Sequence, residues 1–78
     1  MARYFFDVRD GTLSSIDKEG AEHASVAAAE SEAIKSLADM ARSMLLASKI
    51  TDTTISVRDE AGVTVLTVSL KFEIVRKP

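Results

Sequence analysis

Two kinds of hydrophobic spacing divide the chain. Apolar and polar side chains alternate in residues 2–8, 53–59 and 63–70, which is the two-residue period of a half-buried strand. In residues 26–48 the apolar side chains instead recur every three or four positions, and Ser25 just before them is a typical helix N-cap. The spacing therefore predicts one long helix with a single buried stripe, and strands on both sides of it.

Turn residues predict how these strands are connected. Asp10-Gly11 suits a two-residue hairpin turn, so residues 12–16 are expected to return as a short second strand. Residues 59–62 suit a longer turn that ends on glycine, and residues 17–24 are expected to form a loop. The order β-β-α-β-β predicts an α+β fold in which two hairpins form a mainly antiparallel four-stranded sheet with the helix on one face.

The register of the second hairpin leaves two alternatives open. If Asp59 pairs with Val63, then Val63 and Val65 share a face with Ile55 and Val57. A longer alternating series would then face away from the helix: Leu66, Val68, Leu70, Phe72 and Ile74. Either the hairpin is bulged differently, or the sheet has apolar side chains on both faces.

An apolar second face would need a partner, and this favours a homodimer. Three consecutive aromatic residues point the same way, because Phe5 must face opposite to Tyr4 and Phe6. The predicted interaction surface consists of Phe5, Val63, Val65, Phe72 and Ile74.

Length and composition indicate a single small domain over residues 1–78, with residues 71–78 as a tail that frays or extends the last strand. A chain of 78 residues has little core, and without cysteine it has no disulfide to compensate, so self-association is the expected source of extra stability. Charged residues interrupt the N-terminal region, and no stretch approaches the roughly 20 apolar residues of a membrane span. We therefore expect a cytoplasmic protein.

Charge argues against general affinity for nucleic acids. The net charge is -2, and residues 14–40 hold six acids against two lysines, so no dense basic stripe is present. Stacking of single-stranded bases on Tyr4, Phe5 and Phe6 beside Arg3 and Arg9 stays as an alternative. Core or dimer packing is the favoured interpretation of these aromatic residues.

No catalytic or metal-binding pattern is visible. His23 lies close in sequence to Asp17, Glu19 and Glu22, but the spacing matches no known ligand pattern for zinc or calcium. No nucleophile elbow or phosphate-binding loop occurs in the sequence. We therefore predict no catalytic residues, no metal, no cofactor and no enzymatic activity.

The tripeptide Val-Arg-Asp occurs twice, at residues 8–10 and 57–59, and each copy lies at the mouth of a predicted hairpin. Aspartate can bind the backbone of a turn, and the following glycine can take a conformation that other residues avoid. We interpret the repeat as two turns with the same local chemistry and not as a duplicated site.

Four motifs together resemble a known family. They are "RYFFDVRDG" at 3–11, the D-x-x-G-x-E spacing of 17–22, "AAAESEA" at 27–33 and "VRDEAGVTVLTVSL" at 57–70. The family is common in rhizobia and related alphaproteobacteria, is known only as a domain of unknown function, and has members that start with Tyr-Phe-Phe and end in an Asp-Glu-x-Gly hairpin. Ser69-Leu70 stands where Pro-Phe is expected. The resemblance implies the fold and no activity.

The layout is also similar to that of the HicB type of antitoxin, in which an Asp-Gly hairpin precedes an Ala/Glu-rich helix. This similarity implies a second hypothesis, a module that binds a small protein partner. The favoured hypothesis remains a self-associating interaction or accessory domain.

Overall fold

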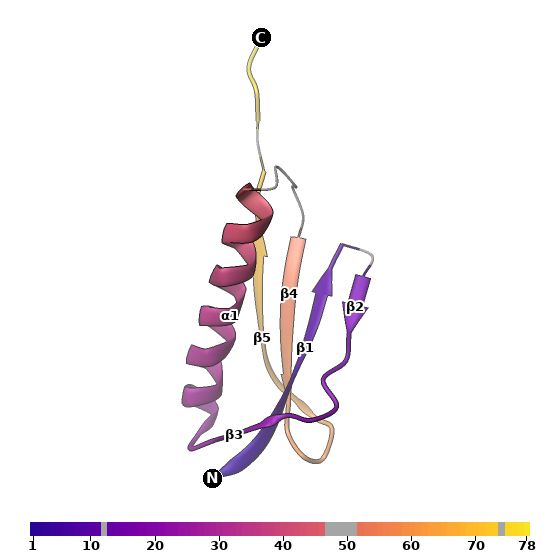
Figure 1. The fold of residues 1–78 in the computed structure, drawn as a ribbon, viewed down its shortest axis with the longest axis vertical. Helices are drawn as coiled ribbons and strands as arrows, with labels where there is room; N and C mark the ends of the chain where they lie inside the picture. The colour runs from indigo at the N-terminus through magenta and orange to yellow at the C-terminus, as the bar shows by residue number, and fades with distance from the viewer. Residues whose placement is uncertain (12, 47–51, 74) are drawn as a thin grey trace.

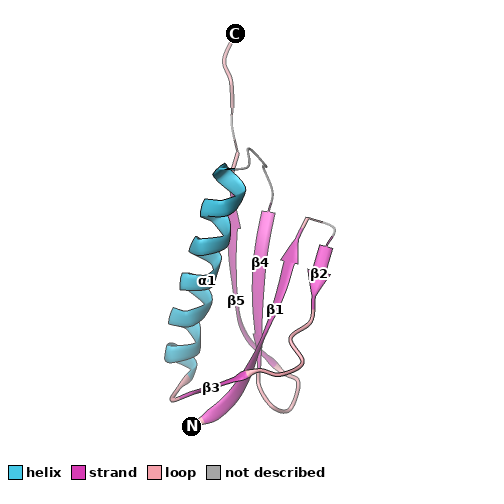
Figure 2. Cartoon of the chain, in the orientation of Figure 1, coloured by secondary structure: helices cyan, strands magenta, loops and turns pink. Residues whose placement is uncertain are grey.

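The computed structural model describes residues 1–11, 13–46, 52–73 and 75–78. Its elements are β1 (Ala2–Asp10), β2 (Leu13–Ser15), β3 (Ala21–His23), α1 (Val26–Leu46), β4 (Asp52–Arg58) and β5 (Thr64–Lys71). The predicted α+β class, with one helix packed on an antiparallel sheet, is confirmed (Figures 1 and 2). The predicted number of strands is wrong, because part of the expected loop forms a fifth strand, β3, that pairs with β1.

Strands β1 and β4 form the centre of the sheet. The order is β2-β1-β4-β5, and every pairing is antiparallel. Strand β2 pairs with the end of β1, opposite Val8 and Asp10, whereas β3 pairs with its beginning, opposite Ala2 and Tyr4. The nine residues of β1 therefore carry two short strands in succession, which a prediction from local hairpins does not anticipate.

The helix begins where the sequence predicts. The Ser25 hydroxyl accepts a hydrogen bond from the Ala28 N–H at 3.1 Å, and the Ser25 carbonyl accepts one from Ala29 at 3.1 Å, which confirms the N-cap. The described helix ends at Leu46, so the last two residues of the predicted helix lie outside the described part of the chain. No helix among the described residues is long and apolar enough to cross a membrane.

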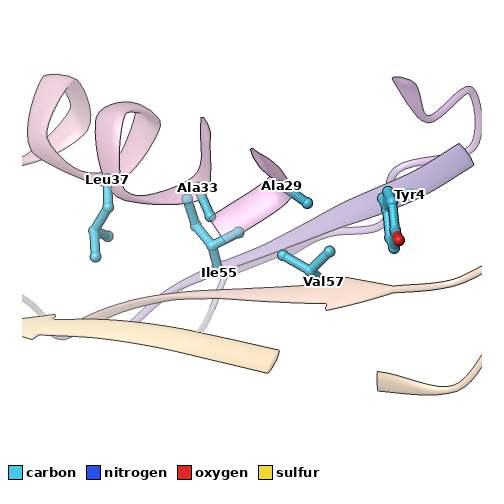
Figure 3. Close-up of a cluster of buried hydrophobic side chains, with 6 residues drawn as sticks. All are labelled: Tyr4, Ala29, Ala33, Leu37, Ile55 and Val57. Atoms are coloured by element: carbon cyan, nitrogen blue, oxygen red, sulfur yellow. The ribbon is translucent and has the colours of Figure 1, made fainter. Parts of the chain in front are cut away.

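The core lies between the helix and the central strands. In the described part of the chain, six apolar side chains are buried there (Figure 3): Tyr4, Ala29, Ala33, Leu37, Ile55 and Val57. Two of the three helix positions are alanine, so the helix can approach β4 closely at this end. Half-buried Phe6, Val8, Met40 and Val68 surround this centre. The core is therefore small.

A β-bulge sets the faces of the second hairpin. The Asp59 N–H donates to the Val63 carbonyl at 2.9 Å, but Arg58 then pairs with Thr64 and Val57 pairs with Leu66. Val65 is the extra residue, and it shifts every later side chain of β5 to the other face. Leu66, Val68 and Leu70 consequently lie opposite Val57, Ile55 and Thr53, on the side of the helix.

This register confirms the alternative of a different bulge and shows that the two-faced apolar sheet was wrong. The face away from the helix is polar on all three long strands: it carries Asp7, Arg9, Thr54, Ser56, Arg58, Thr67, Ser69 and Lys71, with Phe5 as its aromatic member. Hydroxyl groups meet across β4 and β5, Thr54 with Ser69 at 3.1 Å and Ser56 with Thr67 at 3.4 Å. A polar face of this kind is stable against water and needs no cover.

Candidate functional site

Arg58 is the centre of a polar cluster on the open face of the sheet. Its Nε lies 2.6 Å from Asp7 Oδ2, and its Nη2 lies 3.1 Å from Asp7 Oδ1, which is a bidentate ion pair. The same Nη2 donates to the Asp17 carbonyl at 2.9 Å. The guanidinium also lies 5.0 Å from the centre of the Phe5 ring, within the range of a cation–π contact. One side chain thus joins β4, β1 and the loop before β3.

Asp17 fastens that loop to β1. Its Oδ2 accepts the Phe6 N–H at 3.0 Å, and its Oδ1 accepts the N–H groups of Glu19 and Gly20 at 3.1 and 3.0 Å. The Asp17 N–H in turn donates to Asp7 Oδ1 at 3.0 Å. The carboxylate therefore closes the turn of its own loop and at the same time satisfies a backbone donor of β1.

Gly20 completes the attachment, because the backbone passes very close to β1 at this point. Its φ is +70°, and an added Cβ would lie 2.8 Å from the Tyr4 carbonyl oxygen and 2.9 Å from the Phe5 ring. The positive φ and the lack of space for a Cβ atom both require glycine at this position. Arg3 covers the outside of the turn by donating from Nη1 to the Glu19 carbonyl at 2.8 Å.

The electrostatics of the cluster keep both carboxyl groups ionised. Hydrogen bonding from Arg58 is the main cause that holds the pKa of Asp7 below its usual value, and it outweighs the opposing effect of burial. The pKa of Asp17 is lowered chiefly by the N–H of Gly20, with further contributions from Phe6 and Glu19. Carboxylates with lowered pKa values are weak proton acceptors at neutral pH, so the geometry favours an anchoring role.

The predicted interaction surface is not one patch within a single chain. Phe5 lies on the open face beneath Arg58, and Val65 is half-buried at the bulge. Val63 (58% exposed) precedes β5, and Phe72 (38% exposed) follows it, so they lie at opposite ends of that strand. Ile74 lies outside the described residues.

The aromatic residues do not form a stacking platform. Tyr4 is buried and Phe6 half-buried on the side of the helix, whereas Phe5 lies on the other face. His23 packs against both of the helix-side rings, 5.5 Å from Phe6 and 6.3 Å from Tyr4 between ring centres. Among the described residues, no three His, Cys, Asp or Glu side chains are grouped so that they could hold a metal ion.

The comparison with known families agrees with the motifs. The model of the family described as a domain of unknown function, DUF6894, matches residues 3–71. The chain belongs to this family. The matched range contains every residue of the Arg58 cluster and all of the sheet except Ala2, so the DUF6894 domain is the unit described above. No curated protein and no solved structure matches the chain.

The link between Asp7, Asp17 and Arg58 is not among the sites predicted from the sequence. Two indications were present, because Arg58 belongs to the repeated Val-Arg-Asp and Asp17 begins the D-x-x-G-x-E motif. The repeat is interpreted above as two turns and not as a duplicated site, and the second copy agrees with this. Asp59 does bind its turn, since its Oδ1 accepts the N–H groups of Ala61 and Val63. Arg9, in contrast, forms no ion pair with another described residue.

Replacing Gly20 should test the close approach to β1. We expect Gly20→Ala to lower the free energy of unfolding by about 2 kcal/mol or more, because it combines a strained φ with overlap on Tyr4. Gly11→Ala is the matched control, since Gly11 has a φ of +60° with nothing within 4 Å of an added Cβ, and it should cost about 1 kcal/mol. Urea titration measures both, and equal losses would contradict the contact.

The two carboxylates should make stability depend on acid. The folded-state pKa values of Asp7 and Asp17 lie below the usual value of about 3.9. The two ionised carboxylates therefore make their full contribution to the free energy of unfolding above that pH. It is lost as the pH falls through the lowered values. We expect the urea midpoint to decrease below about pH 4, and to decrease less in Asp17→Asn. An identical decrease in the variant would exclude Asp17 as a source.

Proposed function

We propose that this DUF6894 chain is a non-enzymatic, cytoplasmic interaction domain that self-associates as a homodimer. The observation that carries the proposal is the excess of exposed surface over core. The accessible surface is 5699 Å², whereas a compact protein of this mass exposes about 4,600 Å². Part of the difference comes from the C-terminal segment, which extends beyond the sheet and helix (Figure 1).

Apolar side chains contribute to this surface. Among the described residues, nine large ones are exposed: Met1, Leu13, Ile16, Val26, Ile34, Val63, Leu70, Phe72 and Val75. The buried set has six members, two of which are alanine. Since apolar surface removed from water contributes about 25 cal/mol per Å², covering several of these side chains would stabilise the domain considerably. A second copy of the chain is a partner that is present wherever the domain itself is present.

The open polar face does not contribute to this argument. Hydroxyl groups pair across β4 and β5, and Arg58 pairs with Asp7, so water can cover this face at little cost. Support for self-association therefore comes from the side of the helix and from the edge of the sheet. The lack of cysteine is consistent with a reducing compartment.

Self-association should be visible as a dependence on concentration. We expect light scattering after gel filtration to give twice the 8.4 kDa mass of the chain. The midpoint of thermal unfolding should rise with protein concentration, because mass action favours the dimer. A monomeric mass at millimolar concentration, together with a constant unfolding midpoint, would refute the proposal.

A further inference from the structure

Strand β5 has a free hydrogen-bonding edge. It pairs with β4 from Thr64 to Lys71, and no strand among the described residues pairs with its other side. The eight residues include no proline and one charge, Lys71 at the very end. Protected edges carry charges, prolines or bulges along their length, but here the bulge lies at the first residues and leaves the rest open.

The backbone groups on this free edge can be identified from the ladder, because successive residues of a strand direct theirs to opposite sides. The Phe6 N–H points away from β4, since it reaches Asp17. The backbone N–H and C=O groups of Asp7 therefore point toward β4, where Ser56 lies opposite. The backbone groups of Ser56 are used in this pairing and do not reach β5. The backbone groups of the neighbouring Ile55 point toward β5 instead, where they pair with those of Val68. The backbone groups of Ser69, the next residue of β5, therefore point outward. The same alternation leaves the N–H and C=O groups of Thr67, Ser69 and Lys71 at the edge.

We propose that two copies pair antiparallel along β5, with the two-fold axis at Val68. This inference rests on the self-association proposed above and adds its surface and register. The pairing places Leu66 opposite Leu70 of the second copy, on the helix side, and Thr67 opposite its Ser69, on the polar side. Both faces then continue unbroken across the interface, and the hydroxyl pairs of β4 and β5 are extended by one more strand.

The position of the helix is compatible with this pairing. Helix α1 packs over β4 and β5, and neighbouring strands lie about 4.8 Å apart, so the two helix axes would lie about 10 Å apart. That is the normal distance between packed helices. The helix would thus add a second layer of contact above the paired strands.

The flank of the helix that would form this contact is apolar except for exposed Glu30, which lies one turn before Ile34. Helix α1 runs in the direction of β5 (Figures 1 and 2), and each residue turns by about 100° about the axis of a right-handed helix. The residue after buried Ala33 therefore faces the free edge. This flank carries Ile34 (53% exposed), Ala38 and Ala41, whose small side chains permit close packing.

The pairing also brings together two exposed residues that a single chain keeps apart. Phe72 would lie opposite Thr64 of the second copy and next to its Val63. In one chain, Phe72 and Val63 lie at opposite ends of β5. Antiparallel association therefore covers both ends of the strand at once and gives the segment after Lys71 a surface to lie on.

Single cysteines can test the register, since the chain has none of its own. Residues opposite each other in a non-hydrogen-bonded pair have Cα atoms about 4.5 Å apart, within disulfide range. We expect the full-length Val68→Cys protein to form a covalent dimer under mild oxidation, and Ser14→Cys on β2 to stay monomeric on a non-reducing gel. A dimeric mass without this cross-link would overturn the register and leave self-association standing, whereas a monomeric mass would overturn both.

A charge on the edge provides an independent measurement. We expect Ser69→Lys to raise the dissociation constant of the dimer at least tenfold, because the ammonium group would have to leave water beside the second strand. Ser14→Lys makes the same change at an exposed serine of the other edge strand and should leave the constant unchanged. If the two variants dissociate equally in sedimentation experiments, the interface is not β5.

Discussion

The whole arrangement depends on one extra residue in β5. With Val65 inserted, Leu66, Val68 and Leu70 lie on the side of the helix, and Leu66 and Val68 pack against the core with Ile55 and Val57. Without it, these three side chains would face water, and the polar residues between them would lie under the helix. Because the side-chain period of a strand is two, no smaller adjustment could achieve this. The bulge thus decides which face the helix covers and leaves a polar face on the other side.

The polar face is held together by long-range contacts rather than by local ones. Arg58 joins a residue of β1 that is 51 positions away in sequence and a loop residue that is 41 positions away, and Asp17 fixes the same loop to β1. This loop leads directly into β3, whose His23 packs on Tyr4 and Phe6. The cluster therefore acts on both faces: it orders polar groups on one face, and it positions the strand that covers the aromatic residues on the other.

These two features explain what could be predicted from sequence and what could not. Helical spacing and the Ser25 cap locate the helix, and alternation locates the three long strands, because both depend on neighbouring residues. The bulge was foreseen as an alternative but could not be chosen, since the turn closes between Asp59 and Val63 with or without it. Strand β3 has only three residues and exists because Asp17 and Gly20 dock it, so no local pattern indicates it. The Arg58 cluster joins residues that are far apart in the sequence, so the two motifs that contain Arg58 and Asp17 do not show by themselves that these residues meet.

This small domain has few buried side chains, and the strand at one edge of its sheet, β5, has few charges to protect it. Its hydroxyl-rich strands are ordinary on the polar face, but on β5 the same residues leave a nearly uncharged edge beside half-exposed leucine and valine. Many small domains cover such an edge with a second helix or stabilise the fold with disulfides. The sequence has no cysteine, so no disulfide adds stability here. Along β5, apolar side chains lie on one side and hydroxyl groups on the other, and the strand contains no glycine. The proposed second copy would pair along this edge, so that apolar side chains meet on one face and hydroxyl groups on the other.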